Sequence, residues 1–340
     1  MTKNILITGA AGTIGTTLLS LLIKQDGLNI TAFDLKSKKS TKSLNNLKNR
    51  VKIIYGDISK KKEIIIACKN QDIVIHLAAI IPPLADDHPK LANDVNVEGT
   101  RNIIEALEEF SPNAFFIFSS SIAIYGDRIK NPDIKVTDQL SPSEGDEYAL
   151  TKIKAEQLIQ NSKLNWVIFR LTAIMGSKNH KVSKLMFHMP LNTPIEIATP
   201  EDTARALVNA CDHRKELNHQ IFNLGGGENC RILYKDLLSG SFRIFGLGKL
   251  DFPENAFAEK NFHCGNYDDG DNLEKIIHFR QDTINDYFHR LEQTNSPVKK
   301  TLAQLFRKPI QKWLLKQSEP LNALKKNNTA LISRFFYTDK

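Results

Sequence analysis

The sequence has little cysteine and no long apolar run. The 340-residue chain contains four cysteines and no C-x-x-C pair. This usage argues against a disulfide framework and against a zinc site, so we expect no metal centre and a cytoplasmic location. No apolar run approaches the roughly 18–20 residues that a membrane-spanning helix needs. The first residues enter a strand without the apolar region of a secretory signal.

Net charge is also absent from most of the chain. The sequence carries a formal charge of +8, which can indicate a nucleic-acid partner. Residues 295–340 contain ten Lys or Arg and two Asp or Glu, so this tail holds the whole excess and the preceding part is neutral. The folded body therefore gives no support to nucleic-acid binding.

A glycine-rich stretch follows the short apolar strand expected at residues 5–7. Residues 8–15, T-G-A-A-G-T-I-G, have the spacing G-x-x-G-x-x-G and lead directly into a helix start. Glycine permits a positive φ and a close approach of a ligand to the backbone. A helix start presents free N–H groups and a positive dipole end to a diphosphate. The stretch is a variant of the dinucleotide fingerprint, although packing alone can also produce such turns.

A carboxylate follows the second expected strand, residues 29–33. Asp34 lies nineteen residues after Gly15, near the position where a dinucleotide site has an acid for the adenosine ribose hydroxyls. The acid favours NAD as the cofactor, while three lysines between positions 36 and 39 leave NADP as an open alternative. A turn or a helix cap is the other interpretation of Asp34.

Apolar runs alternate with helical stretches between residues 5 and 118 and provide five expected strands. This alternation predicts an α/β fold with a Rossmann-like, doubly wound parallel sheet. His76 lies within an apolar run, so we interpret it as a packed core residue. Ala78 and Ala79 follow it, and such small residues at a strand end let a flat cofactor lie against the backbone.

Tyr148 and Lys152 form a Y-x-x-x-K pair on a helix expected to continue to about Ser162. A separation of four residues places both side chains on one helix face. A nearby ammonium would lower the tyrosine pKa from its usual value of about 10. Such a tyrosine can exchange a proton with a carbinol oxygen while hydride moves to nicotinamide, and Ser121 can hold the same oxygen. Alone, the pair more often marks a solvated helix face.

Taken in this order, the motifs resemble the extended short-chain dehydrogenases/reductases of the NAD-dependent epimerase/dehydratase family. The resemblance covers about residues 3–176 and rests on the glycine turn, Asp34, Gly56-Asp57, the strand 74–79, the stretch 96–100, residues 119–126 and Tyr148/Lys152. It implies that Ser121, Tyr148 and Lys152 form the catalytic group.

The resemblance also implies a set of residues that bind the cofactor or support it. They are Gly9, Gly12, Thr13, Ile14, Gly15, Asp34, Asp57, Ile58, Leu77, Ala78, Ala79, Asn96, Ser119, Tyr148 and Lys152. A structural helix role is the alternative for Asn96. Members of the family often pair as homodimers through helices such as 96–107 and 148–160, so we expect a homodimer by resemblance.

The substrate side departs from the family pattern. Members that act on nucleotide sugars usually carry R-x-x-N-x-Y-G after the sixth strand, but residues 170–176 read R-L-T-A-I-M-G, with Ala173 at the asparagine position. Ile122 and Ala123 stand where the 4,6-dehydratase subgroup needs an acid, which disfavours that dehydration.

We expect hydride transfer at a carbinol carbon of a sugar or sugar nucleotide, with epimerisation as the net reaction. The short segment 177–197 favours the rival, a dehydrogenase or reductase of a smaller carbonyl compound. A non-catalytic dinucleotide sensor or scaffold is the alternative of another class, because fold does not fix function.

The chain is expected to have three parts. Residues 1–176, rejoined by 199–225, form an NAD-binding Rossmann domain. Residues 177–198 and 226–294 form a small substrate-binding portion, and residues 295–340 a basic helical tail.

The tail has an amphipathic pattern. Its apolar residues at helical spacing are Leu302, Leu305, Phe306, Ile310 and Trp313. Lysines form an adjoining stripe, and Pro309 interrupts the helix. A basic amphipathic helix can lie on an anionic membrane surface. Packing on the body or on a partner is the other interpretation.

Overall fold

The computed structural model describes residues 2–177 and 184–337, and its centre is a seven-stranded sheet in the order β10-β7-β5-β4-β1-β2-β3. All neighbouring strands in it are parallel. The strands are β1 (Lys3–Thr8), β2 (Leu28–Asp34), β3 (Lys52–Tyr55), β4 (Ile73–His76), β5 (Phe115–Ser121), β7 (Asn165–Leu171) and β10 (Gln220–Leu224). The strand order reverses between β1 and β4, which confirms the expected doubly wound α/β fold. Such sheets bind ligands outside the carboxyl ends of their strands at this reversal.

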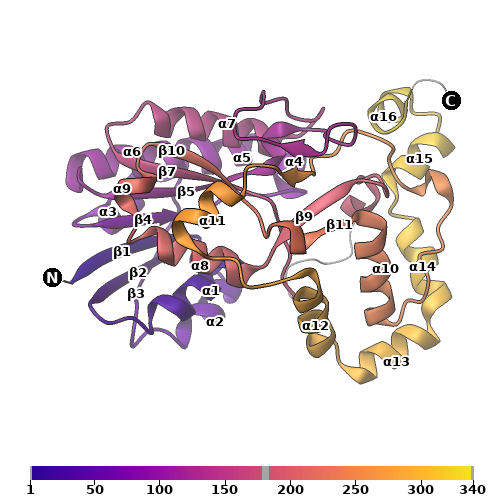
Figure 1. Ribbon diagram of the computed structural model, residues 1–340, viewed down its shortest axis with the longest axis horizontal. Helices are drawn as coiled ribbons and strands as arrows, with labels where there is room; N and C mark the ends of the chain where they lie inside the picture. The colour runs from indigo at the N-terminus through magenta and orange to yellow at the C-terminus, as the bar shows by residue number, and fades with distance from the viewer. Residues whose placement is uncertain (1, 178–183, 338–340) are drawn as a thin grey trace.

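Helices cover both faces of the sheet (Figure 1). One face carries α1 (Thr13–Leu22), α2 (Lys38–Asn45), α8 (Pro200–Ala210) and α11 (Asp271–Ile277), and the other carries α3 (Lys61–Cys68), α6 (Gly99–Phe110) and α7 (Glu147–Gln160). Successive strand residues point to opposite faces. In β1, Ile5 and Ile7 therefore pack into the core below α1, whereas Leu6 packs into the core on the other side. This two-sided burial explains the continuous apolar runs in the sequence.

His76, at the end of β4, is a core residue, as its apolar surroundings in the sequence predict. Its side chain is buried, with Nδ1 2.6 Å from Thr8 Oγ1 and Nε2 3.0 Å from Thr100 Oγ1. Burial, and secondarily the charge of Lys152, lowers the pKa of His76 to about 3. The imidazole therefore stays neutral in the folded protein.

This neutral histidine predicts a loss of stability in acid. The pKa is near 6.5 in the unfolded chain and about 3 in the folded one, so the unfolded chain binds more protons between these values. The contribution of His76 is complete above pH 6.5 and falls as the pH approaches 3, by about 1.4 kcal/mol per pH unit. We expect His76→Gln to flatten the decline of the urea midpoint on acidification relative to wild type. Parallel declines in the two proteins would contradict this assignment.

The chain after β7 builds a smaller lobe beside the sheet (Figure 1). Its three-stranded sheet consists of β11 (Arg231–Leu233), β9 (Pro194–Ala198) and β8 (Ala173–Ile174), and its main helices are α10 (Tyr234–Phe245) and α12 (Ile284–Thr294). A separate apolar core, including Phe187, Leu237 and Phe242, holds this lobe together. Short elements elsewhere are α4 (Leu84–Asp87), α5 (Pro89–Asn93), α9 (Arg214–Leu217) and the paired β6 (Asp133–Ile134) and β12 (Asn266–Tyr267).

The prediction that Pro309 interrupts the tail helix is wrong. The tail forms α13 (Pro297–Leu305), α14 (Arg307–Leu315), α15 (Glu319–Lys325) and α16 (Thr329–Phe335). The first break falls at Phe306, and Pro309 lies within the first turn of α14, where the missing N–H has no intrahelical partner to lose. Leu314, Ala323 and Phe335 are buried, so the tail packs on the lobe beside α10 (Figure 1).

Candidate active site

The turn between β1 and α1 is too tight for side chains at its glycines. Gly9 has φ +70°, and a Cβ there would lie 2.6 Å from the backbone nitrogen of Ala78. A Cβ at Gly15 would lie 2.5 Å from the carbonyl oxygen of Gly9. Gly12 begins α1 without a side-chain cap, so the N–H groups of the first turn, at Thr13 and beyond, are available to an anion. The turn therefore fits a dinucleotide diphosphate.

A methyl group at Gly9 tests this cradle. We expect Gly9→Ala to weaken NAD binding at least tenfold, because its Cβ clashes with the Ala78 backbone. Gly27 is the matched control, since it has φ +74° but no atom of the described residues within 4 Å of the added Cβ. Gly27→Ala should lower the free energy of unfolding by only about 1–2 kcal/mol and leave the NAD dissociation constant from calorimetry unchanged. A normal dissociation constant in Gly9→Ala would place the diphosphate elsewhere.

The carboxyl ends of β1, β2, β3 and β4 enclose a cavity of about 260 Å³ next to this turn. It brings together Gly9, Gly12, Asp34, Asp57, Ile58, Leu77, Ala78 and Ala79. Asp34 Oδ2 accepts a hydrogen bond of 2.7 Å from the backbone N–H of Ala11. Burial raises the pKa of Asp34, and backbone hydrogen bonds from Ala11 and Leu35 oppose that shift. The predicted residues Thr13, Ile14 and Gly15 lie in the first turn of α1, outside this lining.

The predicted catalytic residues lie together at the end of β5. Asp146 caps α7 by accepting a 2.9 Å hydrogen bond from the N–H of Ala149, and this helix carries both Tyr148 and Lys152. The Ser121 hydroxyl lies near enough to the Tyr148 phenol to favour its ionised form. Lys152 Nζ is 5.7 Å from the centre of the Tyr148 ring, so the two side chains share a helix face.

The expected lowering of the tyrosine pKa by Lys152 is not found. Burial raises the pKa of Tyr148 above its usual value, and the nearby Ser121 hydroxyl opposes this shift. Burial also lowers the pKa of Lys152 to about 7, against the charge of Glu156. The lysine donates to the Ser119 carbonyl at 2.6 Å. Burial therefore favours the neutral phenol of Tyr148, the form that can donate to a carbonyl oxygen.

Asn96 and Ser119 make hydrogen bonds that hold the chain segments around the site. Asn96 lies in a one-turn π-helix, Asp94–Glu98, and is 2% exposed. Its amide donates to the Ile80 carbonyl and to Thr151 Oγ1, each at 2.9 Å, and accepts from the Ile80 N–H at 2.7 Å. These bonds join the loop after β4 to α7. Ser119 Oγ donates to the His76 carbonyl at 3.0 Å, so both side chains hold the walls of the site.

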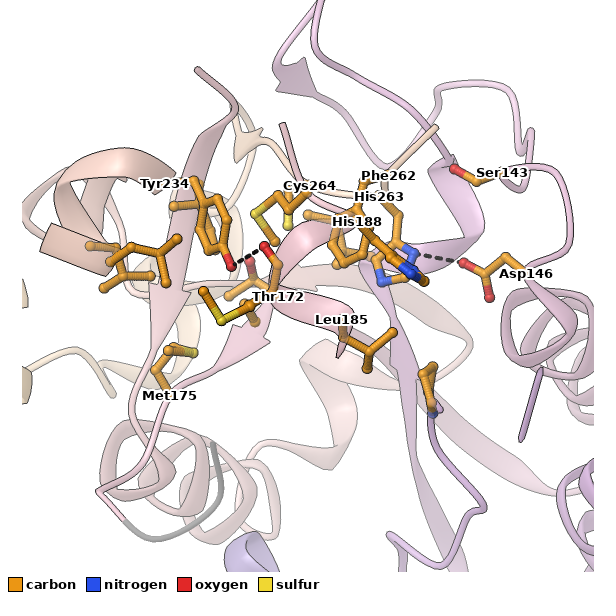
Figure 2. A pocket seen from close by; sticks show the side chains of 18 of the residues that line it. Ser143, Asp146, Thr172, Met175, Leu185, His188, Tyr234, Phe262, His263 and Cys264 are labelled. Carbon is orange, nitrogen blue, oxygen red and sulfur yellow. Dashed lines mark hydrogen bonds and ion pairs between the residues drawn. The ribbon is translucent and has the colours of Figure 1, made fainter. Parts of the chain in front are cut away.

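A second pocket, of about 360 Å³, lies beside Ser121 between the sheet and the smaller lobe. At one end His263 Nδ1 is 2.6 Å from the carboxylate of Asp146, with Ser143 nearby (Figure 2). Arg334 and Phe335 of α16 also line it. Apart from Ser121, none of these residues is predicted from the sequence, because no motif joins them and their segments are far apart in the chain. The tail is thus part of the pocket wall.

The site combines a phosphate cradle, an acid at the end of β2 and a Ser–Tyr–Lys group beside a pocket. This combination defines a Rossmann-type, dinucleotide-binding protein. The chain matches the NAD dependent epimerase/dehydratase family over residues 5–225 and belongs to that family, as its motifs predict. Members of this family are extended short-chain oxidoreductases and epimerases. In the part of the chain that the structure describes, no group of three His, Cys, Asp or Glu side chains could hold a metal ion.

Curated relatives share part of the sequence. CDP-paratose 2-epimerase of Salmonella typhi is 28% identical over 197 residues, which are 51% of this chain and 58% of the relative. 3 beta-hydroxysteroid dehydrogenase type 7 of Mus musculus is 27% identical over 159 residues, 45% of this chain and 43% of that protein. The chain thus spans about half the length of these relatives.

Solved structures share the fold over most of the chain. UDP-glucuronic acid 4-epimerase from Bacillus cereus, in complex with UDP-glucuronic acid and NAD, has a TM-score of 0.70 at 20% identity and covers 88% of this chain and 99% of its own. dTDP-glucose 4,6-dehydratase from Streptomyces venezuelae has a TM-score of 0.72 at 17% identity and covers 85% and 96%.

Proposed function

We propose that the chain catalyses NAD-linked hydride transfer at a carbinol carbon. The observation that carries this proposal is the position of Ser121 in the wall of the second pocket, the larger of the two described above, next to α7, where Lys152 Nζ lies 5.7 Å from the centre of the Tyr148 ring. The dinucleotide cradle lies along the same carboxyl edge of the sheet. One edge therefore holds the groups that position a cofactor and the groups that handle a proton.

Each residue has a defined role in this proposal. Tyr148 accepts the hydroxyl proton of the substrate when the carbinol is oxidised and returns it to the same oxygen when the carbonyl is reduced, and Ser121 orients that oxygen by a second hydrogen bond. Lys152, fixed by the Ser119 carbonyl, binds the nicotinamide ribose and tunes the site. Bound NAD supplies the nicotinamide that accepts hydride.

Epimerisation of a sugar or sugar nucleotide is the net reaction we propose. The family supports it, as do the names of relatives such as CDP-paratose 2-epimerase and UDP-glucuronic acid 4-epimerase. A dehydrogenase or reductase of a smaller carbonyl compound is the second candidate. The apolar side chains that make up much of the pocket lining favour it.

The proposal is tested by identifying the bound cofactor and by measuring whether it is consumed during turnover. Enzyme purified without added nucleotide is denatured, and the released nucleotide and any small molecule are identified by mass spectrometry. Sugar nucleotides, sugars and simple ketones are then assayed with and without added NADH. An epimerase turns over with its own bound NAD, whereas a reductase consumes NADH in proportion to product. Absence of both NAD binding and turnover would overturn the proposal.

We propose NAD as the preferred cofactor. The Asp34 carboxylate lines the adenosine cavity and would accept hydrogen bonds from ribose hydroxyls, but it would repel a 2′-phosphate. Lys39 also lines this cavity. Dissociation constants for NAD and NADP decide between the two, because tighter NADP binding would identify Lys39 as a phosphate contact.

We also propose a cytoplasmic homodimer that pairs through α6 and α7. Leu91 of α5 and Leu150 of α7 are both 42% exposed and would be covered in such a pair. Light scattering should give twice the chain mass for wild type and the chain mass for Leu150→Glu. A monomeric wild type at assay concentration would refute the dimer.

We further propose that α13 and α14 contact an anionic membrane surface. Within the described residues no helix could span a bilayer, but these two helices expose a row of large apolar side chains. We call this row the tail patch: Val298 (68% exposed), Leu302 (51%), Leu305 (74%), Phe306 (52%) and Trp313 (58%). Lysines and Arg307 lie between them in the sequence. Such a surface favours anionic lipid through both apolar burial and charge.

Vesicle cosedimentation tests this contact. Wild type should sediment with vesicles of phosphatidylserine and phosphatidylcholine and not with phosphatidylcholine alone. Leu305→Glu/Phe306→Glu should stay in the supernatant. The control is Ile66→Glu, since Ile66 is 62% exposed on α3, away from the tail patch. Equal sedimentation of all three proteins would contradict the proposed membrane contact of α13 and α14.

A further inference from the structure

We propose that the substrate carries an apolar body which fills the inner half of the larger pocket, beneath α10. The inference rests on the proposed function and concerns the part of the substrate beyond the reacting carbon. Such a substrate is not a sugar nucleotide, so the inference rests on the second candidate of the proposed function, a dehydrogenase or reductase of a smaller carbonyl compound. The ligand class is a cyclic or long-chain secondary alcohol, or the matching ketone, with an unsubstituted hydrocarbon portion.

Side chains from three segments make the inner half apolar. Met175 follows β8, Leu237, Leu238 and Phe242 come from α10, and Leu291 comes from α12. Figure 2 shows Met175, Tyr234 and Cys264 on the side of the pocket opposite Asp146 and His263. A ligand surface placed between these side chains would gain about 25 cal/mol per Å² of apolar area removed from water.

Three hydroxyl groups of the inner half are already bonded within the protein. The Tyr234 hydroxyl donates to the Met186 carbonyl at 2.9 Å, and Ser241 Oγ donates to the Leu237 carbonyl at 2.9 Å. Thr172 Oγ1 donates to the Glu196 carbonyl at 2.5 Å. Each hydroxyl has its donor in use, so polar groups of a ligand would lose their water without full replacement, at about 1–3 kcal/mol each.

The opposite end of the pocket is polar. Ser143 Oγ is buried and has no hydrogen-bond partner among the residues that the structure describes, and the Asp146–His263 pair lies close to it (Figure 2). Ser121 lines the same pocket. The pocket is therefore polar towards the start of α7 and apolar towards α10. A ligand with one oxygenated carbon and a hydrocarbon body matches this division.

A ketone series tests the inference by binding rather than by turnover. The NADH complex of the full-length enzyme is titrated with cyclohexanone and its 4-methyl, 4-propyl and 4-pentyl derivatives, with NADH fluorescence as the readout. The dissociation constant should fall about fourfold for each added methylene until the pocket is full. Met175→Gln, which keeps the volume and adds an amide, should flatten this dependence. Leu238→Trp, which fills the pocket, should weaken the longest ketone most.

Two comparisons keep the result interpretable. Glu144→Gln changes charge at the polar end and should retain the chain-length dependence of wild type. NADH affinity, measured without ketone, should be equal in all four proteins, which separates a wrong pocket assignment from a failed cofactor site. Dissociation constants that do not change with chain length, or the absence of ketone binding to a competent NADH complex, would overturn the inference.

Discussion

Tyr148→Phe is expected to lower kcat by about 10²–10⁴-fold while the NAD dissociation constant changes less than about twofold. Only the phenol oxygen is removed, and with it the proton held beside Ser121. The ring still packs near Lys152, so the fold and the cradle should persist. Steady-state kinetics on the substrate found by the panel, together with NAD calorimetry, measure both quantities.

Tyr337→Phe is the matched control, because Tyr337 is 40% exposed near the end of the described tail. It should keep wild-type kcat. If Tyr148→Phe also kept full activity, the Ser–Tyr–Lys group would be idle, and the non-catalytic dinucleotide sensor would become the better account of the chain.

Arg170→Met is expected to lower the free energy of unfolding by about 3–5 kcal/mol, the usual cost of breaking a buried ion pair. Arg170 is 4% exposed and Glu156 is 2% exposed. The guanidinium donates to both carboxylate oxygens, at 3.1 and 2.8 Å, and to the Tyr125 hydroxyl at 2.7 Å. The substitution leaves the Glu156 charge buried on α7 without a partner.

Urea unfolding at neutral pH measures this effect. Arg101→Met is the control, since Arg101 and Glu98 form a pair whose side chains are 44% and 45% exposed, and an exposed pair contributes at most about 1 kcal/mol. Arg170→Met/Glu156→Leu should recover part of the lost stability, because it also removes the unpaired charge of Glu156. Equal losses of unfolding free energy in Arg170→Met and Arg101→Met would show that the buried pair stabilises the fold no more than the exposed pair.

The sequence defined the first half of the molecule well. Each strand of the doubly wound sheet is a short run of apolar residues, because it is buried on both faces. Gly9 and Gly15 at the turn are required by contacts within a few residues or with the adjacent strand. Local spacing was also enough to place Tyr148 and Lys152 on one helix face. The family assignment follows from these same motifs.

The sequence was less informative where two partners lie far apart in the chain. It predicted that Pro309 interrupts the tail helix, but α13 ends earlier, at Leu305, and α14 to α16 pack on the lobe through residues such as Leu314 and Phe335. It assigned Tyr148 a lowered pKa from the distance to Lys152, although burial of both groups decides the electrostatics. Solvation depends on the whole surrounding shell, which spacing along a helix does not describe.

By itself, then, the sequence determined the sheet, the dinucleotide turn and the composition of the Ser–Tyr–Lys group, because each depends on local periodicity or on a backbone conformation open to few residue types. Only the tertiary structure decided the character of the larger pocket. Its walls come from β5, the β8 region, α10, α12 and the tail, and whether a hydroxyl such as Tyr234 faces a ligand or a carbonyl depends on contacts between segments that no motif connects.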